Sequence, residues 1–191
     1  MEYLIVSGSR QPDGLFDSVM SEIVRGVTEG GADAQILALE GLGRCKACND
    51  GWGVCRSEHI CAFGKDGFHE AQRMVKQADA LCLITPIVLG EPSEAVKNFL
   101  ERIRHCESGD FRALENKPLL ITAFPESSDS GLFSYMEQID KFCRQTGAVI
   151  FDFLSVNRWN SDYQKASAYS AGKAMAYGRK AGEALSRKRR A

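Results

Sequence analysis

The sequence predicts an open, doubly wound α/β fold with a five-stranded parallel sheet. Short apolar runs alternate along the chain with segments whose apolar residues recur at helical spacing. The chain also opens on a strand, a polar loop and a helix: residues 3–6 are apolar, residues 7–14 are rich in turn formers, and an apolar stripe runs from Phe16 to Val27. Strands that each lead into a helix form a parallel sheet with helices on both faces. Such sheets bind ligands beyond the carboxyl ends of their strands.

The first unit contains the first candidate binding site. Its four successive apolar residues, Tyr3 to Val6, predict a strand buried on both faces. In the loop from Ser7 to Ser18, hydroxyls and backbone N–H groups precede a helix whose positive dipole end would face a bound anion. The loop therefore suits a phosphate, although an ordinary turn between a strand and a helix explains this stretch equally well.

The next elements bring the chain to a third strand. Residues 34–39 alternate loosely and predict a second strand at a sheet edge. Residues 41–65 are rich in Gly and Cys and show no clear period. A loop of that length in a compact domain is usually functional or disordered. Asp66 is a candidate cap for a helix over residues 68–78, and residues 80–84 predict a third buried strand.

The second half of the chain repeats this alternation. Residues 85–93 form an apolar loop although they follow a strand, so we expect them to cover something flat and apolar. The elements expected after it are a helix striped from Ala95 to Ile103, a strand over 118–124, a polar loop over 125–131, a helix over 132–143 and a strand over 148–156. From about Asp162 a long helix is expected to turn a small inner face to the sheet, made of Ala166, Ser170, Ala174 and Ala181.

The number of strands narrows the topology. Five strands favour the flavodoxin-like order 2-1-3-4-5 over the six-stranded dinucleotide fold. The first loop also lacks the Gly-x-Gly-x-x-Gly pattern of dinucleotide-binding proteins. Neither an internal repeat nor a linker is evident, so residues 1–191 are expected to form a single domain.

Charge and composition exclude several classes of function. The chain has 24 Lys and Arg against 25 Asp and Glu, so no partner such as nucleic acid or a membrane surface is expected. The one basic run, residues 187–190, is explained by a solvated helix end. Glu2 and the short first apolar run argue against a signal peptide, and no segment reaches the roughly 20 apolar residues of a membrane span. A cytoplasmic protein is therefore expected.

Three stretches carry a resemblance to a known family. The first is Gly8-Ser9-Arg10-Gln11-Pro12-Asp13-Gly14, similar to a phosphate loop of the form Gly-Ser-x-Arg-x-x-Gly-Asn-Thr or Ser. The second is the cysteine stretch that ends in Cys61-Ala62-Phe63-Gly64-Lys65-Asp66. The third is Thr85-Pro86-Ile87-Val88-Leu89-Gly90, followed by Ser93 and the helix over 95–102. Together, in this order and spacing over about residues 3–106, they resemble the NADPH-dependent FMN reductase family, including its iron–sulfur flavoprotein branch.

The resemblance implies bound FMN and a set of residues around it. The FMN phosphate would lie in the loop from Ser7 to Ser18, and the isoalloxazine ring would lie between the Pro86–Gly90 segment and the loop that begins at Phe124. The cofactor-binding residues implied in this way are Ser7, Ser9, Arg10, Gln11, Gly14, Leu15, Phe16, Pro86, Ile87, Val88, Leu89, Gly90, Phe124 and Pro125. The resemblance also implies NAD(P)H as the reductant and a homodimer or tetramer.

Three departures from the family pattern bear on flavin binding. Leu15-Phe16 stands where the family has Asn followed by Thr or Ser, so two phosphate-binding side chains are absent. Arg10 lies one position early, with Gln11 where the arginine is often found, and Val88-Leu89 replaces an aromatic pair near the flavin. Backbone donors can still hold a phosphate. A member of the family that has lost FMN is the alternative.

The cysteines fall into two groups. Seven cysteines without a signal peptide argue against a disulfide framework. Cys82, Cys106 and Cys143 lie in apolar periodic segments and are expected to be small core residues. The other four crowd into the Gly-rich stretch with the spacing Cys45-x2-Cys48-x6-Cys55-x5-Cys61. Four thiolates suit a [4Fe–4S] cluster or a tetrahedral zinc ion, and reduced thiols in an interface loop are the third interpretation.

These observations favour an FMN-dependent oxidoreductase that passes electrons from NAD(P)H through FMN to a quinone, a flavin or another small acceptor. The flavin would carry the chemistry, so no catalytic side chain is required. One alternative is an electron carrier of the iron–sulfur flavoprotein type, with a ferredoxin-like partner. The other is a non-enzymatic metal-binding or thiol-sensing protein on the same scaffold.

Overall fold

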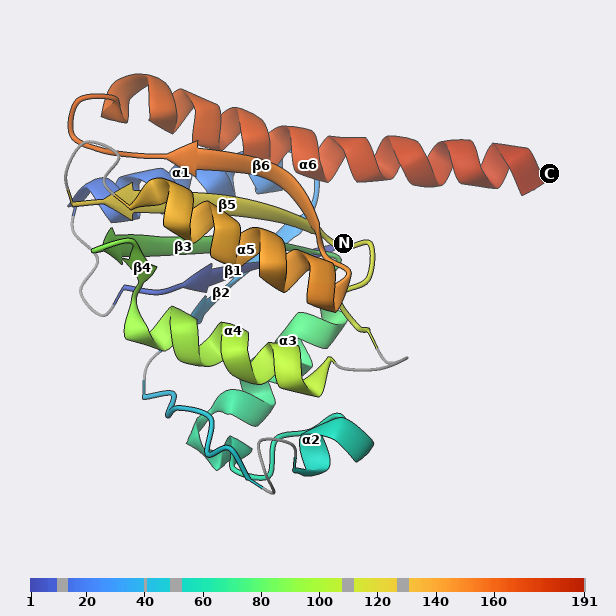
Figure 1. Ribbon diagram of the computed structural model, residues 1–191. Coiled ribbons are helices and arrows are strands. Elements are labelled where there is room, and N and C mark those ends of the chain that lie inside the picture. Colours follow the sequence, from blue (N-terminus) through green and yellow to red (C-terminus); the bar gives the residue numbers. More distant parts are fainter. Residues whose placement is uncertain (10–13, 40, 49–52, 108–111, 127–130, 191) are drawn as a thin grey trace.

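The computed structural model describes residues 1–9, 14–39, 41–48, 53–107, 112–126 and 131–190, with the backbone alone from residue 179 onwards. Its centre is a parallel sheet in the order β2-β1-β3-β5-β6, which is the predicted order 2-1-3-4-5 of the five long strands (Figure 1). These strands are β1 (Glu2–Ser7), β2 (Asp33–Ala38), β3 (Ala80–Val88), β5 (Pro118–Pro125) and β6 (Val149–Ser155).

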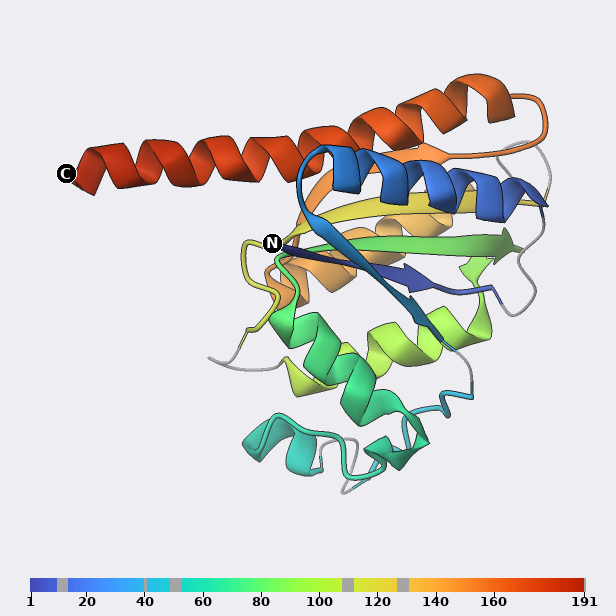
Figure 2. The same ribbon diagram turned by 180° about the vertical axis from the view of Figure 1, so that it is seen from behind.

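Helices cover both faces of the sheet, as the alternating pattern predicts (Figures 1 and 2). On one face lie α1 (Gly14–Glu29) and α6 (Ser161–Arg190). On the other lie α3 (Phe68–Gln77), α4 (Glu94–Cys106) and α5 (Leu132–Thr146). The cysteine-rich stretch, expected to be a loop, contains two short helices, α2 (Val54–Ser57) and the 3-10 helix η1 (Gly64–Asp66).

The strands divide their side chains between two cores. In β1, Leu4 and Val6 belong to the core under α3, α4 and α5, whereas Tyr3 and Ile5 belong to the core under α1 and α6. All four are at most 2% exposed, which confirms the prediction of a strand buried on both faces. The edge strand β2 is largely exposed, as its weaker pattern predicts.

The helices α1 and α6 pack very closely through small residues. A Cβ atom on Gly26 would collide with the backbone of Tyr169 on α6, and one on Gly172 would lie 2.7 Å from the carbonyl oxygen of Ile23. A small inner face on α6 was expected, but three of its residues were assigned wrongly: Ala166, Ser170 and Ala174 are exposed, and the side chain of Ala181 lies outside the described part of the structure. The buried residues are Ala168, Ala171, Gly172, Met175 and Ala176. Because alanine recurs on several sides of this helix, the pattern does not fix which side is buried.

The predicted loop over residues 85–93 is instead a strand extension and a hairpin. β3 continues to Val88, turns through Leu89 and Gly90, and returns as the short antiparallel strand β4 (Glu91–Pro92). Pro86 suggested a strand end because proline cannot donate to a ladder. It is tolerated here because β1 pairs with β3 only as far as Ile84, so the strand beyond has no ladder to β1.

Among the described residues, no helix is both long enough and apolar enough to cross a membrane.

Candidate functional site

A cavity of about 580 Å³ opens where the parallel strands end. Its walls come from the segments that follow β1, β5 and β6, from the end of β3, and from the first turn of α1. The lining residues are Ser9, Leu15, Phe16, Pro86, Phe124, Pro125, Glu126, Val156, Asn157, Arg158 and Trp159. This is the edge at which the sequence predicts a ligand.

Local packing brings these segments together. The N–H of Gly8 donates to the carbonyl of Ile84 at 2.8 Å, which joins the end of β1 to β3. Residue 8 must be glycine because a Cβ atom there would collide with Val96 and lie 2.9 Å from the Ser93 hydroxyl. Beside the cavity, the rings of Phe16 and Phe124 pack with their centroids 4.9 Å apart, so the first turn of α1 contacts the end of β5.

The turn between β6 and α6 forms the opposite wall and is fixed by two asparagines. The Asn157 side chain accepts hydrogen bonds from the N–H groups of Trp159 (2.9 Å) and Asn160 (3.1 Å). The Asn160 side chain accepts from the N–H of Asn157 (2.7 Å) and donates to the carbonyl of Ser155 (2.8 Å). Between them, the guanidinium of Arg158 stacks over the Trp159 ring, with 4.2 Å from Cζ to the ring centroid.

Six of the residues implied for FMN line this cavity: Ser9, Leu15, Phe16, Pro86, Phe124 and Pro125. Six others do not. Ser7 is buried in β1, Ile87 in the core, and Gly14 is exposed at the start of α1. Val88 and Leu89 are exposed on the hairpin, where Gly90 packs against Gly131. Arg10 and Gln11 lie outside the described residues.

Sequence reasoning missed the wall built by Val156, Asn157, Arg158 and Trp159, and it did not include Glu126 among the residues around the flavin. A usable signal was present, because the polar segment 157–160 directly follows the fifth strand and must therefore lie at the same edge.

The cavity suits a flavin. Its volume lies in the ordinary range for small-molecule sites. Proline and phenylalanine side chains give it an apolar wall for a flat ring, while the Ser9 hydroxyl and the first turn of α1 face the same space.

The four clustered cysteines also come together. Cys45, Cys48, Cys55 and Cys61 border one small pocket of about 20 Å³, next to α4. Cys82, Cys106 and Cys143 are buried as expected, and Cys106 of α4 also borders this pocket. Burial raises the pKa of the Cys55 thiol and raises that of Cys106 to about 12.

Two side chains of α4 contact the sulfurs of this pocket. The Arg102 guanidinium donates to the sulfur of Cys61 at 3.4 Å, and Nδ1 of His105 lies 3.5 Å from the sulfur of Cys45. Burial lowers the pKa of His105, and the neighbouring positive charge of Arg104 lowers it further. Cationic and imidazole groups therefore face the thiols from one helix.

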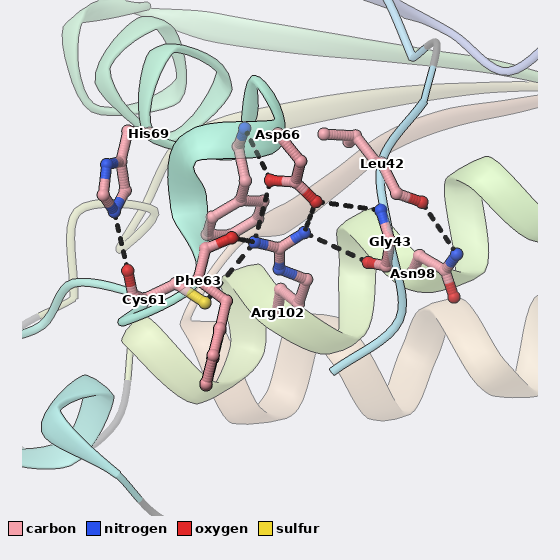
Figure 3. Close-up of polar contacts among 9 residues, drawn as sticks. Leu42, Gly43, Cys61, Phe63, Asp66, His69, Asn98 and Arg102 are labelled. Carbon is pink, nitrogen blue, oxygen red and sulfur yellow. Dashed lines mark hydrogen bonds and ion pairs between the residues drawn. The ribbon is translucent and has the colours of Figure 1, made fainter. Parts of the chain in front are cut away.

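Arg102 holds the whole cysteine-rich stretch against α4 (Figure 3). Its side chain is 2% exposed and pairs with both carboxylate oxygens of Asp66, at 2.6 and 3.1 Å. It also donates to the carbonyls of Gly43 and Phe63, each at 3.0 Å. Burial alone would raise the pKa of Asp66, but Arg102 and the N–H groups of Gly43 and Phe68 hold it below its ordinary value.

The pocket does not fit a metal as it stands. Within the part of the chain that the structure describes, no three His, Cys, Asp or Glu side chains are grouped so that they could hold a metal ion. A space of about 20 Å³ is also close to the size of one water molecule. The donor chemistry matches a cluster, but the arrangement does not.

Comparison with known proteins agrees with this geometry. The family model described as NADPH-dependent FMN reductase matches residues 1–160, which include every residue that lines the larger cavity. An iron–sulfur flavoprotein of Methanocaldococcus jannaschii is 28% identical over 144 residues, covering 74% of this chain and 71% of that protein.

Two solved structures share the fold at low identity. A flavone reductase superimposes with a TM-score of 0.70 at 18% identity, covering 96% of this chain, which spans only 64% of that protein. The NAD(P)H:quinone oxidoreductase from Methanothermobacter marburgensis superimposes with a TM-score of 0.65 at 13% identity, covering 91% of this chain and 95% of that one. Since the family model matches most of the chain, the protein belongs to the NADPH-dependent FMN reductase family.

Proposed function

We propose that this protein is an FMN-dependent oxidoreductase that takes electrons from NADH or NADPH and passes them to a quinone, a flavin or another small acceptor. The observation that carries the proposal is the cavity of about 580 Å³ at the carboxyl edge of the sheet. Its place at a strand-end crevice, its apolar wall and the family match over all its lining residues support a flavin as the ligand.

In this proposal the protein binds and orients the flavin. Pro86, Phe124 and Pro125 would pack against the ring, and Phe16 would support Phe124 from behind. Ser9 and the N–H groups at the start of α1 would face the phosphate, together with Arg10, Gln11 and Gly14 of the same loop. When bound, FMN supplies the site that accepts and returns two electrons. The apolar side chains would exclude water from the reacting face, and no side chain need act as an acid or base.

The first test is an absorption spectrum of the purified protein, followed by NADH and NADPH oxidation with a soluble quinone. We expect flavin bands, or their recovery on adding FMN, and acceptor-dependent turnover. Phe124→Ala should weaken FMN binding roughly 10- to 100-fold, since it removes ring contact worth about 1.5–3 kcal/mol. Phe151→Ala is the matched control, because Phe151 is 42% exposed on β6 and does not line the cavity. Protein that remains colourless in excess FMN would overturn the proposal.

A second candidate is an electron carrier that also holds an iron–sulfur cluster on Cys45, Cys48, Cys55 and Cys61. What favours it is that these four thiols border one pocket, together with the name of the M. jannaschii relative. It requires the stretch to rearrange around the cluster. Iron and sulfide should then be found in anaerobically purified protein, with a ferredoxin-like protein as the electron partner. Zinc alone, or no metal, would leave a thiol-sensing role for the same residues.

We also propose a homodimer or tetramer. Two large apolar side chains near the start of α5, Leu89 on the hairpin and Phe133 on α5, are 93% and 83% exposed. Light scattering on the purified protein gives the mass directly, and a monomer at micromolar concentration would contradict this proposal.

A further inference from the structure

We propose that Arg158, in the turn between β6 and α6, binds the phosphate of the flavin and makes the site select FMN over riboflavin. This inference rests on the proposed function, because the ligand is the same flavin in the same cavity. It adds a residue that lies far in sequence from the phosphate loop.

The first argument is the balance of charge around the cavity. Among the described residues that line it, Arg158 is the one basic side chain and Glu126 is the one acidic side chain. A phosphate monoester carries between one and two negative charges at neutral pH and is held by charge-assisted hydrogen bonds. The first-turn side chains on the cavity wall are Leu15 and Phe16, which can donate none. The described donors are therefore Ser9, Asn157, Arg158, Trp159 and the N–H groups at the start of α1, and Arg158 alone among these side chains carries a positive charge.

The second argument is that the turn before α6 lies near the start of α1. α1 and α6 pack side by side along the same face of the sheet, and both begin at the carboxyl edge (Figure 2). The turn before α6 therefore faces the start of α1 across the cavity, and residues from both line it. In this proposal, a cation on this turn contacts an anion that is held at the start of α1.

The third argument is preorganisation. Asn157 and Asn160 hold the turn with four hydrogen bonds of 2.7–3.1 Å, so the backbone that carries Arg158 is fixed. The guanidinium carbon of Arg158 lies over the Trp159 ring, 4.2 Å from its centroid, as in a stacked cation–π pair. Stacking in this way leaves the N–H donors in the plane of the group, which is the edge that binds phosphate. Arg158 is exposed at the cavity wall, but the fixed turn and the Trp159 ring limit the positions that its side chain can take.

The experiment compares two flavins that differ only in the phosphate. FMN and riboflavin are titrated into flavin-free protein, and binding is followed by the change in flavin fluorescence. We expect the wild type to bind FMN more tightly than riboflavin. Arg158→Gln should weaken FMN binding roughly 10- to 100-fold, the usual worth of a charged hydrogen bond, and leave riboflavin binding within about twofold. Arg158→Lys should fall in between, because it keeps the charge but loses the fork of donors.

Two further variants sharpen the result. Glu126→Gln removes the opposing charge and should shift the FMN-to-riboflavin ratio in the other direction. Arg144→Gln is the matched control, because this arginine is 76% exposed on α5 and does not line the cavity. Thermal unfolding of each variant checks that the fold is kept.

Several results would overturn the inference. Equal loss of both flavins in Arg158→Gln would mean that Arg158 shapes the cavity without contacting the phosphate. An unchanged ratio of FMN to riboflavin affinity in Arg158→Gln would also overturn the inference. So would a ratio that falls in Arg10→Gln and not in Arg158→Gln. If the wild type binds riboflavin as tightly as FMN, the inference fails while the proposed function stands. If the wild type binds neither flavin, both fail.

Discussion

Arg102 and Asp66 are the residues on which the cysteine-rich stretch depends. We expect Asp66→Asn to destabilise the protein by about 3 kcal/mol at pH 7, because it leaves the buried charge of Arg102 without the carboxylate that balances it. The pKa of Asp66 is lowered in the folded state, so its stabilisation is present above its ordinary value of 3.8 and is lost as the pH falls through the folded pKa. Urea unfolding of both proteins, repeated from pH 7 downwards, should show two stability curves that converge only in acid.

A matched control for this prediction is Glu94→Gln. It breaks the Arg44–Glu94 pair, in which the side chains are 77% and 60% exposed, and should cost less than about 0.5 kcal/mol. A difference between wild type and Asp66→Asn that does not change with pH would show that the carboxylate charge is not what stabilises this region.

At the scale of single residues, the sequence indicates which residues belong to the site better than it indicates what surrounds each of them in the fold. The family resemblance implied one site for Ser9, Phe16, Pro86 and Phe124, and they line one cavity because the ends of parallel strands meet at the same edge. Arg102 could not be found, because a charged residue in an amphipathic helix ordinarily faces solvent, whereas here the folded cysteine-rich stretch and Phe68 of α3 cover it. Arg158 was missed because its role depends on the place of the last turn relative to the first.

At the scale of the elements, the close contact between α1 and α6 leaves no space for a larger side chain at Gly26. We expect Gly26→Val to destabilise the protein by about 3 kcal/mol and lower the Tm by roughly 6–12 °C, because its side chain would enter the backbone of Tyr169. Thermal unfolding followed by circular dichroism measures this directly. Gly178→Ala, where a Cβ atom meets nothing within 4 Å, should keep or slightly raise the Tm. A Gly26→Val protein as stable as the wild type would mean that the two helices can separate without cost.

The β3–β4 turn stores strain at one residue. Leu89 has a φ of 51° and Gly90 a φ of 80°, and a two-residue turn of this kind prefers Asn before Gly. We expect Leu89→Asn to stabilise the protein by about 1 kcal/mol, since Asn adopts positive φ more readily and Leu89 is 93% exposed. Leu89→Ala keeps the strain and should show no gain. If urea unfolding shows a loss of stability in Leu89→Asn, the leucine side chain has a contact in solution, such as a second subunit.

For the whole molecule, the strand order could be predicted from the number of strands, their alternation with helices and the missing dinucleotide-binding pattern. The β3–β4 hairpin and the buried side of α6 could not be predicted. Pro86 suggested that the strand ends before the hairpin, and the many alanines of α6 do not indicate which of its sides is buried. These details depend on contacts between segments that are distant in the sequence, and a local sequence pattern does not predict such contacts.

The family match ends at residue 160, and α6 begins at residue 161, so the last helix lies outside it. We propose that residues 1–191 nevertheless form one folding unit. Ala168, Met175 and Ala176 complete the core under α1, and the hydroxyl of Tyr3 in β1 donates to the carbonyl of Met175 at 2.8 Å. Beyond this contact the helix projects past the sheet (Figures 1 and 2).

Two truncations test whether α6 belongs to that unit. A chain that ends at Asn160 uncovers Tyr3, Ile5, Ile23 and Val27, each at most 1% exposed in the full chain. Exposing several large side chains costs about 2 kcal/mol for each, which approaches the whole stability of a domain. We therefore expect aggregation or loss of cooperative unfolding. A chain that ends at Gly178 keeps every contact described between α6 and the body, and its Tm should stay within a few degrees of the full chain. If the shorter chain unfolds cooperatively at the same temperature as the full chain, α6 is an accessory helix and the core is complete without it.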